Sequence, residues 1–234
     1  MTYRTALVTG ASRGIGLGIV RELLAAGVTV VATVRSSSNG LSELAAQASG
    51  RLHIVQLDTA SAESIAACVE GLKKDFQHFD LVVNNAGIVE EARPFVEVKE
   101  QEILNVLRVN TIGPFLVTQK LLAAGLIGQP GSVVANISSL LGSIGTKEFN
   151  EFPVYAYRAS KAALNSITRF ADVALASEGI SSVAIHPGYV ATDLNNHSGT
   201  ITVEESAKGI VQVLTSGKDL HGRFYGYDGA ELPW

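Results

Sequence analysis

The stretch "LVTGASRGIGLG", residues 7–18, contains the feature that decides the fold. A β-branched apolar segment ends at Thr9, and a glycine-rich turn then leads into a helix-like segment near Gly14. Glycines at 10, 14 and 16 let the backbone turn sharply and approach a pyrophosphate, while the helix N-terminus offers N–H donors. This Gly-x-x-x-Gly-x-Gly spacing between a strand and a helix indicates a dinucleotide-binding turn. The alternative is an ordinary flexible loop between a strand and a helix, without a binding role.

Strand and helix signals alternate along the rest of the chain. Short β-branched segments predict strands, and segments with apolar residues spaced three and four apart predict helices. The predicted strands cover residues 5–9, 28–34, 51–57, 80–85, 131–137, 181–186 and 222–227. The predicted helices cover residues 14–26, 40–48, 61–75, 99–126, 155–178 and 203–216.

These strands are apolar along most of their length, which a parallel sheet covered on both faces requires. We therefore predict an α/β, Rossmann-type, doubly wound parallel sheet of about seven strands with helices on both faces. In such a sheet, ligands bind at the carboxyl ends of the strands. Neither a linker nor a repeat divides the chain, so we expect one domain over residues 1–234, with a cofactor-binding part at about 1–130 and a catalytic and substrate part at about 131–234.

Composition and charge exclude several classes of function. The net charge is −4 and the basic residues form no stripe, so no nucleic-acid partner is expected. The single cysteine, Cys68, cannot form an internal disulfide, and no signal-like or membrane-length apolar segment occurs, so we expect a cytoplasmic protein without a membrane partner. None of the histidines lies in a zinc-binding pair, so no metal is expected; they are His53, His78, His186, His197 and His221.

The stretch "PVYAYRASKAALN", residues 153–165, contains two tyrosines, and helical spacing distinguishes them. Residues four apart share a helix face, which pairs Tyr157 with Lys161 but pairs Tyr155 with Ala159. A phenol titrates near pH ~10, so a neighbouring cation is needed to lower its pKa. We predict that Tyr157 is the chemical residue and that Tyr155 is a pocket-wall or packing residue. The alternative to a catalytic pair is that Tyr157 and Lys161 are ordinary surface residues that lie four apart on a helix.

Three motifs together resemble the signatures of the classical short-chain dehydrogenase/reductase family: "TGASRGIG", "NNAG" (84–87) and Tyr157-x-x-x-Lys161. They occur in the family's order and with close to its spacing. The resemblance extends from Thr5 almost to the C-terminus. The segments "YRASKAALN" and "GRFYGYDGAELPW" further resemble the C-factor and sniffer-like branch of carbonyl reductases.

The resemblance implies two more catalytic residues. An asparagine three residues before the catalytic serine points from Asn136 to Ser139, and alternation along a strand end selects only one of Ser138 and Ser139. Both hydroxyls could instead cap the following loop. The matching asparagine of the family, Asn110, kinks its helix and holds a water that links the lysine to solvent; here it could instead satisfy a neighbouring backbone group. The predicted catalytic set is Asn110, Ser139, Tyr157 and Lys161.

The resemblance also assigns the cofactor contacts. Asp58 would meet the adenine amino group, although it could instead cap a helix, and Asn84 would tie strands together. Val190 and Thr192 would hold the nicotinamide carboxamide, although their segment could be a plain Pro-Gly turn. The predicted cofactor-binding residues are Gly10, Ser12, Arg13, Gly14, Ile15, Gly16, Arg35, Asp58, Asn85, Ala86, Gly87, Tyr157, Lys161, Pro187, Gly188, Val190 and Thr192.

The end of the second predicted strand favours NADP(H) over NAD(H). Val34 stands where NAD-dependent relatives tend to carry an aspartate, so no carboxylate would repel a 2′-phosphate there. Arg35, the hydroxyls of Ser36 and Ser37, and Arg13 could bind that phosphate. The alternative is that both arginines are solvated surface charges.

We predict NADPH-dependent reduction of a carbonyl to an alcohol, with Tyr157 as proton donor. The 18-residue separation of Ser139 and Tyr157 is longer than in compact members of the family, and the excess lies beside the expected pocket. Apolar lining favours a small or aromatic ketone, aldehyde or quinone; the predicted lining is Leu140, Leu141, Phe149, Phe152 and Tyr189. The alternatives are a dinucleotide-binding signalling protein of the C-factor type with little turnover, and an epimerase or dehydratase. Monomer, homodimer and homotetramer all remain compatible with the sequence.

Overall fold

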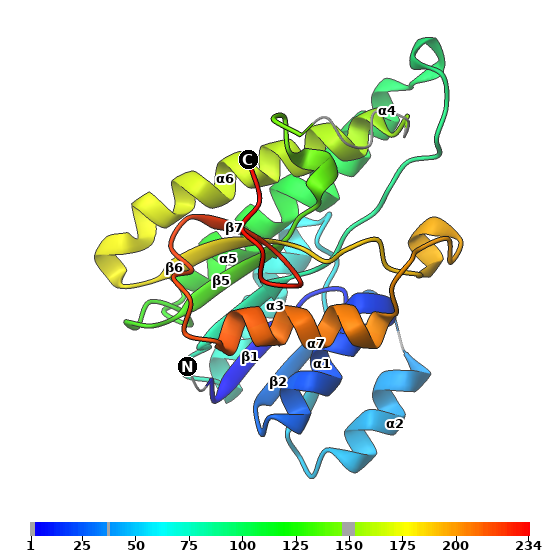
Figure 1. Ribbon diagram of the computed structural model, residues 1–234. Helices are drawn as coiled ribbons and strands as arrows, with labels where there is room; N and C mark the ends of the chain where they lie inside the picture. Colours follow the sequence, from blue (N-terminus) through cyan, green and yellow to red (C-terminus); the bar gives the residue numbers. More distant parts are fainter. Residues whose placement is uncertain (1–2, 37, 147–152) are drawn as a thin grey trace.

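A seven-stranded sheet in the order β3-β2-β1-β4-β5-β6-β7 forms the centre of the molecule (Figure 1). The computed structural model describes residues 3–36, 38–146 and 153–234. Each pair of neighbouring strands is parallel, as predicted. The strands are β1 (Thr5–Val8), β2 (Thr29–Val34), β3 (Leu52–Gln56), β4 (Leu81–Asn84), β5 (Val133–Ile137), β6 (Ser181–His186) and β7 (Arg223–Gly226).

Helices cover both faces of this sheet, which confirms the doubly wound prediction (Figure 1). The α-helices are α1 (Gly14–Ala25), α2 (Asn39–Gln47), α3 (Ala62–Asp75), α4 (Glu100–Leu107), α5 (Gly113–Ala123), α6 (Tyr155–Leu175) and α7 (Val203–Thr215). Short 3-10 turns occur at η1 (Phe95–Glu97), η3 (Leu140–Gly142), η4 (Ala176–Glu178) and η5 (Asp193–Asn195). Among the described residues, no helix combines the length and the apolar character needed to cross a membrane.

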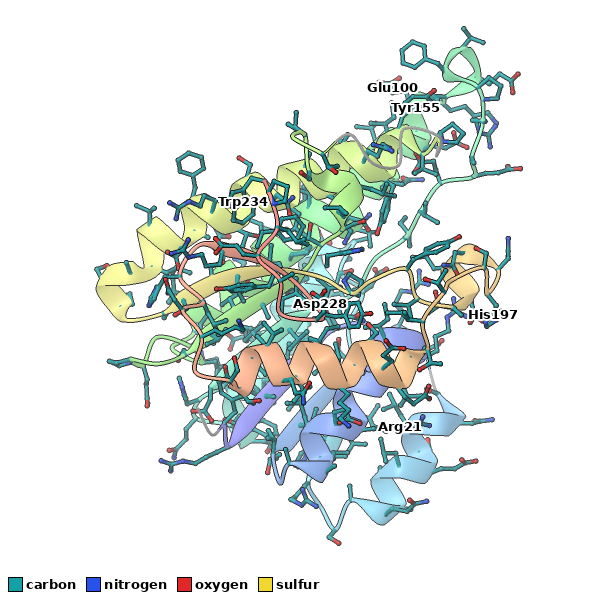
Figure 2. All side chains as sticks on the ribbon, viewed as in Figure 1. Arg21, Glu100, Tyr155, His197, Asp228 and Trp234 are labelled. Atoms are coloured by element: carbon teal, nitrogen blue, oxygen red, sulfur yellow. The ribbon has the colours of Figure 1, made fainter. Side chains whose placement is uncertain are left out.

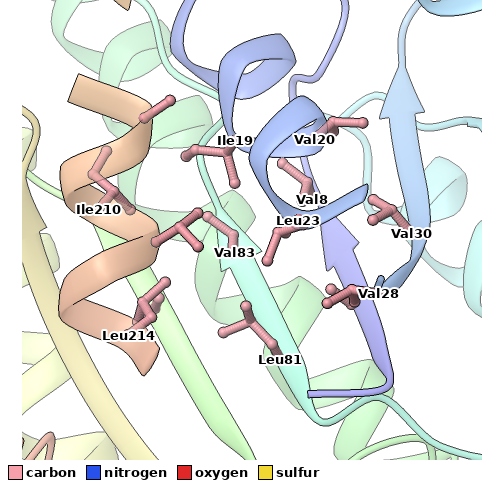
Figure 3. Packing of buried hydrophobic residues seen from close by; sticks show 14 of the residues in the cluster. Val8, Ile19, Val20, Leu23, Val28, Val30, Leu81, Val83, Ile210 and Leu214 are labelled. Carbon is pink, nitrogen blue, oxygen red and sulfur yellow. The ribbon is translucent and has the colours of Figure 1, made fainter. Parts of the chain in front are cut away.

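Two hydrophobic clusters, one on each face, hold the helices to the sheet. Successive strand residues point to opposite faces, so Val8 joins the cluster under α1, α2 and α7, while Leu7 joins the cluster under α3, α5 and α6. Figure 3 shows the first cluster, in which Ile19 and Leu23 of α1 and Ile210 of α7 pack over the sheet. The apolar strands are therefore buried from both sides, as their sequence indicated.

The helical segment predicted over residues 99–126 is interrupted in the region where the resemblance implied a kink. The structure divides it into α4, a π-helical segment η2 (Arg108–Ile112) and α5. Pro114 lies at the start of α5 and lacks an N–H group, and the wider π turn accommodates the break. Asn110 lies inside the π-helical segment, so the helix is disturbed at the residue where the resemblance implied a kink. The last turn ends before Gly125, whose φ of 70° reverses the chain.

The order of the strands places the ligand crevice. From β1 the chain proceeds outward to β2 and β3, and it then returns to β4 on the other side of β1. The connections therefore diverge between β1 and β4, and a crevice opens above the carboxyl ends of these two strands. The glycine turn after β1 and the segment after β4 form its two sides.

Candidate active site

A cavity of about 1170 Å³ lies at the carboxyl ends of the strands. All the predicted cofactor-binding residues line it, from the glycine turn to Thr192. Ser139, Tyr157 and Lys161 line the same cavity, together with Leu140, Leu141 and Tyr189 of the predicted substrate pocket. Phe149, Phe152 and Ser37 lie outside the described residues. One continuous cavity therefore joins the glycine turn to the predicted catalytic side chains.

The glycine turn forms a closely packed floor for this cavity. Gly10 has a φ of 64°, and a Cβ there would come within 2.7 Å of the Ala86 Cα. A Cβ at Gly16 would come within 2.4 Å of the Gly10 carbonyl oxygen, so neither position has room for a side chain. The Asn85 amide donates to the carbonyls of Thr9 and Gly10, at 3.0 and 3.1 Å. The side chain of Asn85 thus holds the turn in place, a role that the sequence did not predict.

Ser138 and Ser139 point in different directions at the end of β5, as strand alternation predicted. Ser138 is buried and its hydroxyl donates to the Asn165 amide oxygen on α6. Ser139 lines the cavity together with Tyr157, and its hydroxyl acts to lower the pKa of that tyrosine. It also accepts the Leu141 N–H at 3.1 Å, so Ser139 caps the following turn as well as contacting the tyrosine.

Asn84 and Asn136 brace the strands beneath this site. The Asn84 amide donates to the Asn136 amide oxygen at 2.9 Å, which joins β4 to β5 as expected. The Asn136 amide in turn donates to the Thr168 hydroxyl on α6, at 2.9 Å. The strand that carries Ser139 is therefore fixed to the helix that carries Tyr157.

Tyr157 and Lys161 lie on the cavity face of α6. The Lys161 Nζ is 5.6 Å from the centroid of the Tyr157 ring and donates to the Ile137 carbonyl at 2.7 Å. Only 4% of Lys161 is exposed. Burial lowers its pKa to about 8, because the low-dielectric surroundings disfavour the charged form.

The Tyr157 pKa is shifted in the direction opposite to that expected. Lys161 was predicted to lower it, yet burial raises the pKa of Tyr157 to about 12. The hydrogen bond from Ser139 lowers the pKa, and the negative charge of Glu90 raises it. Desolvation of the phenolate therefore outweighs the favourable contacts, and the protein's own groups hold Tyr157 in its protonated form.

Tyr155 packs away from this site. It is 38% exposed, does not line the cavity, and its ring contacts the Phe95 ring edge to face, with centroids 5.3 Å apart. Tyr155 is the first residue of α6, which packs against α4. Of the two roles that the sequence left open for Tyr155, the structure supports packing.

Asn110 lies buried behind the cavity wall. Its amide nitrogen donates to the Ile88 carbonyl at 2.8 Å and to the Ser160 hydroxyl at 3.0 Å, and its amide oxygen accepts the Ile88 N–H at 2.9 Å. The side chain therefore ties the segment after β4 to α6. This is the alternative role that the sequence left open, satisfaction of a neighbouring backbone group, and the water relay stays a prediction.

Charged and hydroxyl side chains line the end of the cavity next to β2. Val34, Arg35, Ser36 and Arg13 all line it. The Arg13 Nε is 3.3 Å from Asp193 Oδ2, in an ion pair whose two side chains are 73% and 52% exposed. A pair this exposed is weak, so Arg13 can exchange it for another anion at little cost.

Asp58 lies against the same end of the cavity. Its Oδ1 accepts the Ala60 N–H at 2.9 Å, which closes a local turn. The alternative reading of Asp58 as a helix cap is wrong, because Ser61 occupies that position and accepts the Ser64 N–H at 3.1 Å.

The segment after β6 closes the other side of the cavity. Val190 pairs with Ile201, and Asn195 accepts the Thr192 N–H and donates to the Val190 carbonyl. These bonds make the segment more than the plain Pro-Gly turn that the sequence left open. Burial lowers the pKa of His186 to about 4, so its ring is neutral at pH 7. In the parts of the chain that the structure describes, no cluster of three or more His, Cys, Asp or Glu residues is arranged to hold a metal ion.

Glu90 is a site residue that sequence reasoning missed. It lines the cavity, and its two carboxylate oxygens accept the N–H groups of Ala156 and Tyr157, at 2.6 and 2.9 Å. One feature of the sequence indicates that α6 needs an acceptor from elsewhere: Val154, the residue just before the helix, has no side-chain acceptor for the N–H groups of the first turn. No spacing rule connects that missing cap to a residue more than sixty positions earlier.

Comparisons with known proteins agree with this geometry. The pattern of the family described as short chain dehydrogenase matches residues 4–201. The structure of an NADPH-bound carbonyl reductase from chicken fatty liver is 34% identical, with a TM-score of 0.89 and complete coverage of both chains. The carbonyl reductase Sniffer of D. melanogaster is 32% identical, with a TM-score of 0.90 over 99% of each chain. The C-signal protein of Myxococcus xanthus is 34% identical over 156 residues, which are 66% of this chain and 92% of that protein.

Proposed function

The chain belongs to the short chain dehydrogenase family of oxidoreductases, and from that premise we propose that it reduces a carbonyl compound to an alcohol with NADPH. The observation that carries the proposal is that Ser139, Tyr157 and the buried Lys161 line the same cavity as the glycine turn. These groups can receive a carbonyl oxygen and donate a proton to it, while the reducing equivalent comes from a dinucleotide held along the same cavity.

The residues of the cavity fit such a dinucleotide. Side chains at Gly10 and Gly16 would collide with neighbouring backbone, so the floor stays low enough for a pyrophosphate to approach the N-terminus of α1. Arg35, Ser36 and Arg13 would bind a 2′-phosphate, and the apolar Val34 offers no repelling carboxylate. Asp58 would contact the adenine, and Val190 and Thr192 the carboxamide.

Tyr157 donates the proton to the carbonyl oxygen, and the phenol carries that proton at neutral pH. When bound, NADPH supplies the hydride that adds to the carbonyl carbon. Ser139 orients the carbonyl oxygen by hydrogen bonding, and Lys161 would contact the nicotinamide ribose. Asn110 would supply protons through a water relay, in addition to fixing Ile88 and Ser160.

The apolar part of the cavity supports a small or aromatic ketone, aldehyde or quinone as the substrate. Leu140, Leu141 and Tyr189 line the cavity, and Val154 and Leu194 add further apolar surface. A signalling protein of the C-factor type with little turnover is not favoured, because the four predicted catalytic side chains are all present. Assembly as a homodimer or homotetramer and a cytoplasmic location stay predictions.

The test is NADPH consumption by the purified protein in the presence of a panel of aliphatic and aromatic ketones, aldehydes and quinones. Consumption is followed by absorbance, and the alcohol is identified by chromatography. We expect alcohol to form in proportion to the NADPH consumed with at least one carbonyl class. A protein that binds NADPH but reduces no member of the panel would favour the signalling alternative.

A further inference from the structure

The N-terminus of α6 lacks a cap of its own. The first N–H groups of a helix need acceptors from outside the helix, and an Ser, Thr, Asp or Asn residue at the N-cap usually provides one. In α6 the N-cap is Val154, which has no side-chain acceptor, and the first turn contains no acidic residue. The cap is supplied instead by Glu90 from the segment after β4, through its two bonds to Ala156 and Tyr157.

This arrangement brings a negative charge to the backbone of the proposed proton donor. Glu90 is half-buried in the cavity wall, so solvent screens its charge less than it would at an exposed site. Burial is the main cause of the raised pKa of Tyr157, and the Glu90 carboxylate raises it further, because a negative charge near a phenol disfavours the phenolate. The other charged or titratable groups that line this cavity are Arg13, Arg35, Asp58, Glu91, Lys161, His186, Tyr189, Asp193 and His197. Arg158 follows Tyr157 on α6, and Arg93 pairs with Glu91 and with Glu102 of α4.

We propose that Glu90 is a positioning residue that fixes the first turn of α6 and holds Tyr157 in its proton-donating form. The proposal rests on the proposed function, because carbonyl reduction needs a protonated Tyr157 and alcohol oxidation needs the phenolate. Glu90 does not alter the overall equilibrium between carbonyl and alcohol. It sets the pH range in which each direction is fast, and it extends the range of reduction toward higher pH.

The test compares Glu90→Gln with Glu91→Gln. Glu90→Gln keeps the size of the side chain but removes its charge, whereas the neighbouring Glu91 is 83% exposed and pairs with Arg93, which makes it a matched control. The pH profile of kcat/KM is measured for both reduction and oxidation. We expect Glu90→Gln to shift the tyrosine-dependent limb of both profiles toward acid by about 0.5 to 1 pH unit, and Glu91→Gln to leave it in place. At any one pH the overall equilibrium fixes the ratio of the two kcat/KM values, so the effect is seen in the position of the two limbs.

A second variant separates charge from capping. Val154→Ser supplies a neutral N-cap within α6, so the double variant Val154→Ser with Glu90→Gln keeps the helix start capped while the charge is removed. Compared with Val154→Ser alone, it should show the same acid shift. Equal loss of both directions at every pH, without any shift, would mean that Glu90 only stabilises the helix and would overturn the proposal.

A titration that needs no turnover keeps this test separate from the proposed function. Tyrosine labelled at its ring ζ-carbon reports ionisation by NMR, and Tyr157→Phe identifies the resonance of Tyr157. We expect Tyr157 to ionise at lower pH in Glu90→Gln than in the unmodified protein. If the protein reduces no carbonyl, the proposed function fails, but the titration still decides the role of Glu90; an unchanged Tyr157 titration would refute that role.

Discussion

Replacing Arg35 with alanine should lower kcat/KM with NADPH about 10- to 30-fold while leaving kcat/KM with NADH nearly unchanged. Arg35 lines the β2 end of the cavity and is exposed there. A hydrogen bond to a charged group contributes about 1.5 to 3 kcal/mol, and we take the lower part of that range, about 1.5 to 2 kcal/mol, because solvent reaches the guanidinium. Each 1.4 kcal/mol corresponds to about tenfold in rate or affinity.

Initial rates with the two cofactors, measured at fixed carbonyl concentration and low salt, check this prediction. Arg21→Ala is the matched control, because Arg21 is an exposed arginine of α1 that does not line the cavity (Figure 2). Ser36→Asp complements Arg35→Ala, because it adds a carboxylate at the exposed β2 end of the cavity, and this variant should disfavour NADPH further. Val34→Asp is a poorer choice, since Val34 is only 6% exposed and belongs to the core. Equal use of both cofactors by the unmodified protein, or an equal loss with both in Arg35→Ala, would refute the reasoning.

Two further predictions concern stability and the glycine floor. Burial lowers the pKa of Lys161 from 10.5 to about 8, so the unfolded chain binds more protons between these values and the free energy of unfolding should rise with pH across that window. Urea unfolding of Lys161→Met should show a smaller rise and greater stability near pH 7, together with lost turnover; an unchanged pH dependence would contradict the cause given. Gly16→Ala would place a Cβ 2.4 Å from the Gly10 carbonyl oxygen, so NADPH affinity measured by fluorescence should fall at least about tenfold, equivalent to about 1.4 kcal/mol. An NADPH affinity equal to that of the unmodified protein would show that the neighbouring backbone can shift to accommodate the added methyl group.

Sequence patterns with a local physical origin predicted most of the fold. Apolar β-branched runs and helical spacing located each strand to within two residues and each uninterrupted helix to within three, because burial on a parallel sheet imposes those periods. The glycine turn between strand and helix and the four-residue spacing from Tyr157 to Lys161 are also local patterns, and they identified residues that line the cavity. The break at Arg108–Ile112 was only indicated, since periodicity alone does not distinguish a π turn from a continuous helix.

Features that depend on contacts between distant segments could not be predicted. Glu90 caps α6 from the segment after β4, and Asn85 holds the glycine turn from the same segment. The direction of the Tyr157 pKa shift depends on how deeply the phenol is buried, and helical spacing carries no information about that. Burial and long-range hydrogen bonds therefore account for the parts of the site that the sequence missed.

The most direct test of the central claim is the rate of carbonyl reduction by Tyr157→Phe compared with Tyr155→Phe, with NADPH affinity measured in parallel. Tyr157→Phe removes one hydroxyl from the cavity and keeps the ring, whereas Tyr155 packs against Phe95 outside it. Because general acid catalysis contributes about 10²- to 10⁴-fold, Tyr157→Phe should lose at least about 100-fold in kcat with NADPH affinity nearly intact. Tyr155→Phe should stay within about twofold of the unmodified protein, since surface changes of this kind are nearly neutral. Similar rates for the two variants, or inactivation by Tyr155→Phe alone, would contradict the assignment of Tyr157 as the proton donor.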